Sequence, residues 1–402
     1  MDTITQEWKP TVAPSEAGPL GERPLRIQFT GSGSEYFRIW IVNLLLSIVT
    51  LSLYHPWAKV RRLRYFYGNT LVDGHALDFH GNPLKMLRGY LLVGVLVICY
   101  SSAGRFSPAA AVVAVVIFAV VFPALLRASM QFRLANTSWR GLRFRFSGSL
   151  GGAYRAMLPL FIPTLAFAII GLGITDPRVP PVWYLKAIGL IFLAALILAP
   201  AVWWNFKRYQ HDHYGLGQWQ TKLTIGPGSM YGLTFRVIGV MLLSALVVFV
   251  VAVILVVIVA VSMGLAQGFN KEVFAEHRAM MGLLGGLIGL AVYFFALIVP
   301  VPYAMSRSQN LVWTNTRCEE LRFDSKLLFL PLTWLTVKNW LLMVFTLGLY
   351  FPFATVALYR MRVESITPQL SGDIDLLQAQ AAAAGDASGD AAGDFFGIDM
   401  GL

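Results

Sequence analysis

Long apolar segments alternate with short basic ones along most of this chain of 402 residues. A helix needs about 20 apolar residues to cross the roughly 30 Å hydrocarbon layer of a bilayer. Uncharged apolar segments of about that length or more cover residues 107–126, 156–175, 187–206, 237–270 and 279–306. The pattern therefore predicts a mainly α-helical protein that crosses a membrane several times.

Three further apolar segments are weaker candidates for spans. Residues 39–58 and 339–359 each carry a proline near one end, and residues 89–104 are followed at once by Arg105. Composition supports a membrane protein, because 56% of the residues are hydrophobic and only 13% are charged, against about a quarter charged in soluble domains. We expect a polytopic bundle of 6–8 transmembrane helices.

Two of the weaker segments carry copies of one motif. Residues 50–65 read TLSLYHPWAKVRRLRY and residues 346–361 read TLGLYFPFATVALYRM, with identical residues at eight positions. Proline disrupts a helix interior because it lacks an amide hydrogen and clashes with the preceding turn. A shared structural motif is therefore predicted around Tyr54, Pro56, Trp57, Tyr350 and Pro352.

The polar connections also resemble one another. Residues 136–144, NTSWRGLRF, align without gaps on residues 315–323, NTRCEELRF, and residues 69–79 have the same parts with two residues more. Apolar and basic residues alternate in residues 142–146, which is typical of a β-strand. The Asp73-Gly74 pair favours a tight hairpin turn.

An isolated hairpin is only marginally stable in water, so we expect these elements to pair with one another. The predicted product is a small cytoplasmic sheet beneath the helices, formed by β elements near residues 26–34, 68–82, 136–149, 215–229 and 315–325. Asparagine side chains bond to nearby backbone in turns. We therefore expect a capping or turn role for Asn69, Asn136 and Asn315.

The two ends of the chain differ in composition from the rest. Residues 1–25 are polar, and residues 369–402 are rich in alanine, glycine and aspartate. Such segments cannot bury enough apolar surface to offset the entropy of ordering. We predict a disordered N-terminal tail at 1–25, a membrane domain at 26–368 and a disordered acidic tail at 369–402.

The net charge of +11 is concentrated in alternate connections between the apolar segments. Basic loops stay on the cytoplasmic side of the inner membrane, so these connections are predicted to be cytoplasmic. Arginines beside a membrane also contact anionic lipid headgroups. The positive charge therefore indicates membrane lipids as partners and does not require nucleic acid.

This orientation leaves two topologies open. Eight full spans put both termini outside and give the two motif copies opposite directions. Six full spans plus two re-entrant segments, broken near Pro56 and Pro352, put both termini inside. We favour the second topology, because a strand expected near residues 26–34 then lies on the same side as the other β elements.

The N-terminal part of the chain contains a set of short motifs: Phe29-Thr-Gly-Ser-Gly, Tyr36-Phe37, Tyr54-x-Pro56-Trp57-Ala58, Arg64-Tyr65 and Asn69. In this combination the chain resembles the YjgN-like family of bacterial inner-membrane proteins, whose function is not established. The resemblance is strongest over residues 26–82 and extends to residue 368. It implies a multi-pass inner-membrane protein and assigns no catalytic or binding residue.

The sequence contains no recognisable catalytic motif and gives no reason to expect an enzyme or a cofactor. Histidines at 211 and 213 could share one face of a strand, which makes His211 and His213 weak metal candidates. The simpler interpretation is that both are solvated beside the membrane. No metal is predicted.

Two functions fit this pattern. The first is a passive or ion-coupled transporter or channel for a small or lipidic solute, with recruitment of anions by Arg61, Arg64, Arg140 and Arg143. The second is a noncatalytic membrane scaffold whose cytoplasmic β platform docks a partner protein. We favour the first, because a polytopic bundle is more than a docking platform requires.

Overall fold

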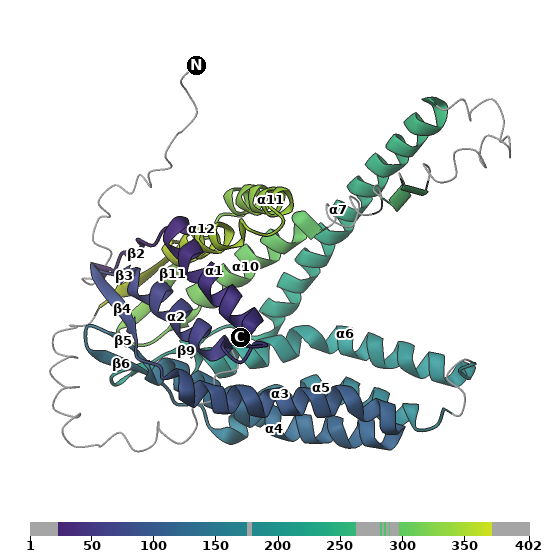
Figure 1. The fold of residues 1–402 in the computed structure, drawn as a ribbon, viewed down its shortest axis with the longest axis horizontal. Helices are drawn as coiled ribbons and strands as arrows, with labels where there is room; N and C mark the ends of the chain where they lie inside the picture. The colour runs from purple at the N-terminus through teal and green to yellow at the C-terminus, as the bar shows by residue number, and fades with distance from the viewer. Residues whose placement is uncertain are drawn as a thin grey trace.

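The computed structural model describes residues 23–174, 179–262 and 297–371, together with residues 282, 283, 285, 286 and 289. In Figure 1 the long helices extend from one end of the molecule, where the strands gather. The predicted tails lie outside the described residues up to residue 22 and from residue 372. The predicted span at 279–306 and the end of the span at 237–270 fall largely outside them as well.

Five described helices are long and apolar enough to cross a membrane. They are α3 (Pro83–Phe106), α4 (Pro108–Ala135), α5 (Leu150–Gly171), α6 (Val182–His211) and α7 (Pro227–Ser262). The segment at 89–104, a weaker candidate from its sequence, is thus part of a full-length helix. A mainly helical, multi-pass fold with short β elements is confirmed.

The two motif-bearing segments form helical hairpins instead of single spans. Their helices are α1 (Gly33–Val49) and α2 (His55–Gly68) in the first, and α11 (Phe329–Phe345) and α12 (Phe351–Glu364) in the second. The 14 residues of α2 and of α12 extend only about 21 Å. Each segment is therefore a helix–turn–helix unit, a shape that the re-entrant topology requires; its depth in the membrane stays a prediction.

Both hairpins turn in the same way. The Thr50 hydroxyl donates to Leu46 O at 2.7 Å and accepts from the Tyr54 amide at 3.0 Å. Thr346 makes the same two bonds, to Leu342 O at 2.6 Å and from the Tyr350 amide at 3.0 Å. The threonine thereby satisfies backbone groups exposed by the break in the helix.

The break itself precedes the prolines. Leu51, Ser52, Leu347 and Gly348 have positive φ, which ends a right-handed helix. Pro56 and Pro352 lie in the first turn of the next helix, where a missing amide hydrogen costs nothing. The aromatic residues beside them also match, since the Tyr54 and Trp57 rings stack at 6.0 Å and those of Tyr350 and Phe353 at 5.4 Å.

Four β-hairpins connect the helix pairs. They are β3 (Thr70–Val72) with β4 (His75–Phe79), β5 (Thr137–Trp139) with β6 (Leu142–Phe146), β7 (Tyr214–Leu216) with β8 (Trp219–Gln220) and β9 (Lys222–Leu223), and β10 (Thr316–Arg317) with β11 (Leu321–Ser325). A fifth unit joins the two ends of the described chain: β12 (Ile366–Leu370) pairs with β1 (Arg23–Pro24), which leads into β2 (Ile27–Phe29).

The strands close into a ring. One sheet runs β2-β3-β4-β5-β6-β7-β8 and the other runs β9-β10-β11-β12-β1. Only Thr221 separates β8 from β9, and Leu25 and Arg26 separate β1 from β2. The two sheets therefore join at both ends, and closure removes the exposed edges that a small open sheet would have.

Ring closure shifts the predicted ends of the membrane domain. Residues 23–25, assigned to the N-terminal tail from their sequence, carry β1 and a buried Leu25. Residues 369 and 370, assigned to the C-terminal tail, belong to β12, a strand that the sequence did not predict. Both ends of the described chain consequently lie on the same side as the hairpins.

The asparagines and threonines of the Asn-Thr pairs close helix ends. Asn69, Asn136 and Asn315 donate through Nδ2 to the carbonyl four residues earlier at 2.8, 2.7 and 2.8 Å. The hydroxyls of the following threonines donate likewise, each at 2.7 Å. These bonds satisfy terminal carbonyls that a helix otherwise leaves without partners, and they fix the angle at which each strand leaves its helix.

Truncation tests whether β12 is required for the ring. A chain ending at residue 365 lacks the partner of both β1 and β11, so we expect it to aggregate or to lose its cooperative thermal transition in detergent. A chain ending at residue 371 keeps every strand that the structure describes and should elute and melt like the full protein. Equal behaviour of the two truncated chains in size-exclusion chromatography and melting would contradict ring closure.

Candidate functional site

The described helices contact one another in a closed cycle. Each helix packs against its neighbours in the chain, α7 packs against α10 (Pro300–Thr314), and α12 packs against α1. Five of these helices, α2, α4, α6, α10 and α12, lead directly into the first strand of a β unit. The cycle of helix contacts therefore follows the same order as the β units.

An apolar cluster packs together residues from all of the β units. Its buried members are Leu25, Trp139, Leu142, Leu216, Trp219 and Leu370, and Val72, Leu77, Phe144, Cys318 and Leu321 pack against them. Every β unit contributes, so the cluster lies where all five meet. The Trp139 indole also donates to Val72 O at 3.1 Å and ties the second hairpin to the first. We call this cluster the apolar plug.

The four arginines predicted to recruit a solute do not form one group. Arg61 and Arg64 lie on α2, where the Arg61 guanidinium is 5.9 Å from the Tyr54 ring centre and Arg64 Nε donates to Phe79 O at 3.4 Å. Arg140 and Arg143 lie on the β5–β6 hairpin. Arg61 and Arg64 therefore contact the first helical hairpin and β4, whereas Arg140 and Arg143 lie on the strand ring.

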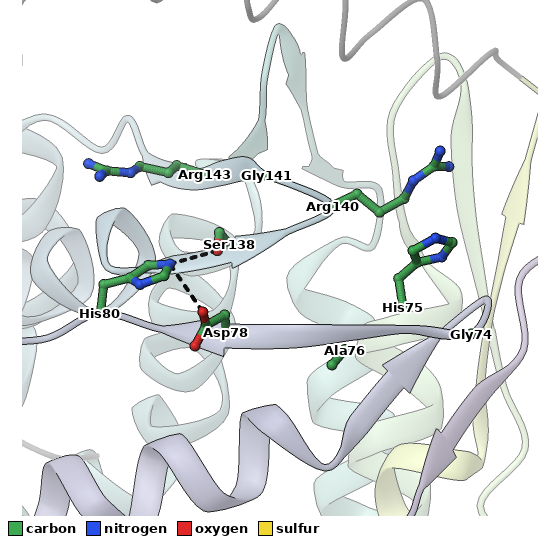
Figure 2. Close-up of a pocket in the computed structure, with 9 residues that line it drawn as sticks. All are labelled: Gly74, His75, Ala76, Asp78, His80, Ser138, Arg140, Gly141 and Arg143. Carbon is green, nitrogen blue, oxygen red and sulfur yellow. Dashed lines mark hydrogen bonds and ion pairs between the residues drawn. The ribbon is translucent and has the colours of Figure 1, made fainter.

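Arg140 and Arg143 line a groove of about 660 Å³ between the first two hairpins. Figure 2 shows the residues of this groove, which are Gly74, His75, Ala76, Asp78, His80, Ser138, Arg140, Gly141 and Arg143. His80 Nε2 lies 2.9 Å from Ser138 Oγ and 3.7 Å from Asp78 Oδ2. The lining holds two guanidiniums, two imidazoles and one carboxylate, a set of charges that suits an acidic ligand.

The two histidines of the first hairpin, His75 and His80, both line this groove, although residues five apart lie on opposite faces of a regular strand. His75 begins β4, but His80 follows the last residue of that strand. Its ring turns towards Ser138 on the neighbouring hairpin (Figure 2). The alternation of side chains between the two faces of the strand ends at Phe79, so it does not determine where the His80 side chain points.

His211 and His213 have separate structural roles. His211 is buried, with Nδ1 2.9 Å from the Thr316 hydroxyl, so it is not the solvated residue expected from its sequence. His213 Nδ1 lies 2.8 Å from Tyr209 O, four residues earlier. Within the described ranges no group of three potential ligands could hold a metal ion.

The contact of His213 identifies a capping residue that the sequence analysis missed. His213 and Tyr214 occupy the place of the Asn-Thr pair in the third hairpin, because His213 bonds to the same i−4 carbonyl as Asn69, Asn136 and Asn315. The available signal was spacing: His213 precedes a strand directly, as each asparagine does.

Comparison with known proteins agrees with this architecture. Over residues 24–395 the chain matches the model of a family described as "Bacterial protein of unknown function (DUF898)". It is 25% identical over 367 residues to "Inner membrane protein YjgN" of Salmonella typhimurium, covering 87% of this chain and 89% of that protein. The protein of that name from Escherichia coli K12 is 30% identical over 148 residues, 36% of each chain.

No solved structure matches the chain significantly. The family model covers most of the sequence. The relatives are named as inner-membrane proteins, and the described part of this chain has five helices long and apolar enough to cross a membrane. The predicted likeness to the YjgN proteins is thereby confirmed. This multi-pass inner-membrane protein belongs to the bacterial family DUF898.

Proposed function

We propose that this protein is a passive or ion-coupled transporter or channel for a small or lipidic solute. The observation that carries the proposal is the closed cycle of helix contacts next to the closed strand ring, with the apolar plug at the strand end. We infer that a path through the membrane runs inside this cycle of helices, whereas a docking platform needs only a surface. The plug then acts as the closed gate of that path.

Basic side chains on the hairpins make the strand-side entrance of this path positively charged. The Arg140 side chain leaves a tight turn at the tip of the second hairpin, and Arg143 lies in the adjacent strand. Positive charge around a concave surface raises the local concentration of anions. Arg64 is better explained as a structural residue, because it bonds to the Phe79 carbonyl at the end of β4.

The proposal includes an orientation in which the hairpins and both termini face the cytoplasm. Basic residues are concentrated at the hairpin end, and positively charged loops are retained on the cytoplasmic side during insertion. In this orientation the plug closes the path from the inside.

A membrane scaffold is the second candidate, and the groove between the first two hairpins favours it. Its rim carries Arg140, Arg143 and His75 around a volume of about 660 Å³, which could accept an acidic segment of a partner protein. A scaffold would need the groove but no path through the membrane. Opening the plug therefore separates the two functions.

Replacement of a plug tryptophan should open the path. Trp139→Ala or Trp219→Ala removes a large buried side chain at a cost of roughly 3–5 kcal/mol in stability. In planar bilayers containing potassium chloride, we expect each variant that still melts cooperatively to pass an anion-selective current that the unaltered protein lacks. The matched control is Trp334→Ala, because the Trp334 side chain is 72% exposed on α11.

Silent bilayers with both folded plug variants would contradict the transport proposal and favour the scaffold. A current of the same size from Trp334→Ala would also contradict it, because that current would not depend on the plug.

Cysteine labelling tests the orientation. The two native cysteines, Cys99 and Cys318, are first changed to serine. Burial raises the pKa of the Cys318 thiol, so this cysteine adds little background labelling even before it is replaced. We expect an impermeant maleimide outside spheroplasts to label Arg105→Cys, at the far end of α3, but to label Ser371→Cys only after lysis. The reverse labelling pattern would show the opposite orientation. Labelling of both Arg105→Cys and Ser371→Cys from outside would exclude the proposed orientation.

A further inference from the structure

Five helices carry a buried proline at one shared position. In α2, α4, α6, α10 and α12, which each lead into a β unit, the proline lies 13 residues before the residue that closes the helix end. The prolines are Pro56, Pro123, Pro200, Pro302 and Pro352, and the closing residues are Asn69, Asn136, His213, Asn315 and Ser365. We call each stretch from the proline to its closing residue a proline segment. The chain thus repeats one helical segment before every β unit that the structure describes.

Buried apolar clusters join most of the consecutive proline segments. The centre of the Phe66 ring on α2 lies 4.7 Å from that of the Tyr359 ring on α12, and both rings pack in one cluster with Val356. Val60 on α2 and Phe132 on α4 share a second cluster. Parting these helices would expose apolar surface to water, which is unfavourable in proportion to the area exposed.

The next two junctions are joined in the same way. Leu126 and Met130 on α4 share a buried cluster with Tyr209 on α6. Trp204 on α6 packs against the cluster that contains Val312 on α10. Apolar side chains therefore hold together four of the five junctions between proline segments.

The fifth junction, between α10 and α12, is joined by hydrogen bonds, and we call it the seam. Arg362 Nε donates to Gln309 Oε1 at 2.9 Å. The Gln309 amide donates to Arg362 O and to the Ser365 hydroxyl, both at 2.9 Å. Among the residues that the structure describes, no buried apolar cluster spans these two helices. The three bonds all depend on the Gln309 side chain.

The other contacts of α10 and α12 resemble those at the remaining junctions. Helix α11 packs against both, just as an intervening helix bridges each of the other junctions. The strands that follow the two helices are paired in their own right, because β11 and β12 match over five residues of each strand. The helices can therefore part at the seam while the strand ring stays closed.

Water can take the place of the Gln309 bonds. Arg362 is exposed to solvent, so water reaches the groups that the bonds would release. A hydrogen bond that exchanges with water contributes little net stability, whereas an apolar contact has no such substitute. The seam is therefore the junction that opens most easily.

We propose that the cycle of helices opens at the seam between α10 and α12, and that Gln309 is the latch that keeps it closed. Loss of the bonds of this one side chain releases the contact. For the transport function proposed above, the open seam is a side entrance for a lipidic solute. That role rests on the transport function, but the opening itself does not.

Two buried residues at equivalent positions provide a matched pair of probes. Ser306 lies three residues before Gln309 on α10, and Val356 lies three residues before Tyr359 on α12. Gln309 contacts the next proline segment at the seam, and Tyr359 contacts the next one at the junction with α2. Ser306 is 0% exposed and Val356 is 4% exposed. A thiol at either position therefore reacts only when its junction opens.

Labelling by N-ethylmaleimide measures this opening on the full-length protein in nanodiscs, after both native cysteines are changed to serine. Each rate is divided by the rate for the same variant in denaturant, which removes differences in intrinsic reactivity. We expect Ser306→Cys to react about tenfold or more faster than Val356→Cys, because the reaction rate follows the population of the open form.

Latch variants test the role of Gln309. Gln309→Ala removes the three bonds and should accelerate labelling of Ser306→Cys severalfold. The matched control is Tyr359→Phe, which removes only the 3.0 Å contact with the Thr70 hydroxyl and should leave labelling of Val356→Cys unchanged. The double change Gln309→Leu with Arg362→Leu replaces the bonds by an apolar contact and should slow labelling of Ser306→Cys. Melting curves identify any variant that fails to fold, and the double change decides the role if Gln309→Ala is lost.

Equal labelling rates for Ser306→Cys and Val356→Cys would overturn the inference. So would an acceleration by Tyr359→Phe as large as that by Gln309→Ala, or a double leucine variant that labels as fast as the protein with its latch. Labelling needs no solute, so the seam and the transport function can fail separately. An open seam without current through the plug variants would leave this inference in place and reject transport.

Discussion

The pairing of β12 with β1 and β11 is the interaction on which the rest of the structure depends. Short hairpins are marginally stable alone, and these strands are mostly three to five residues long. They become stable when each backbone edge is paired and all share the apolar plug. Because residues 23–29 and 366–370 complete the ring, the two ends of the membrane domain must meet before every hairpin has both neighbours.

Closure also determines where the helices point. The Asn-Thr pairs and His213 fix the junction between helix and strand, so a ring of hairpins becomes a ring of helices. The two short helical hairpins bring the described chain ends back to the strand side. The same closure packs residues from every β unit into the apolar plug.

Local patterns predicted much of this architecture. Alternation in residues 142–146 predicted a strand, the Asp73-Gly74 turn predicted a hairpin, and the matching motifs at 50–65 and 346–361 predicted equivalent structures. The strand at 366–370 was missed because Pro368 argues against a strand, yet its carbonyl accepts from the Leu25 amide and its missing donor is tolerated. The loop arginines were grouped by charge alone, and the fold separates them.

Cross-linking of the two chain ends tests ring closure most directly. Pro24 and Gln369 are partners in the β1–β12 register, so the double variant Pro24→Cys with Gln369→Cys, in a background without native cysteines, should form an intramolecular disulfide in native membranes. The pair Pro24→Cys with Arg143→Cys, which joins β1 to β6 across the ring, should not. Efficient cross-linking of the first pair alone is the result that the closed ring predicts. Absence of that cross-link in folded protein, or equal cross-linking of both pairs, would contradict the ring and with it the enclosed path.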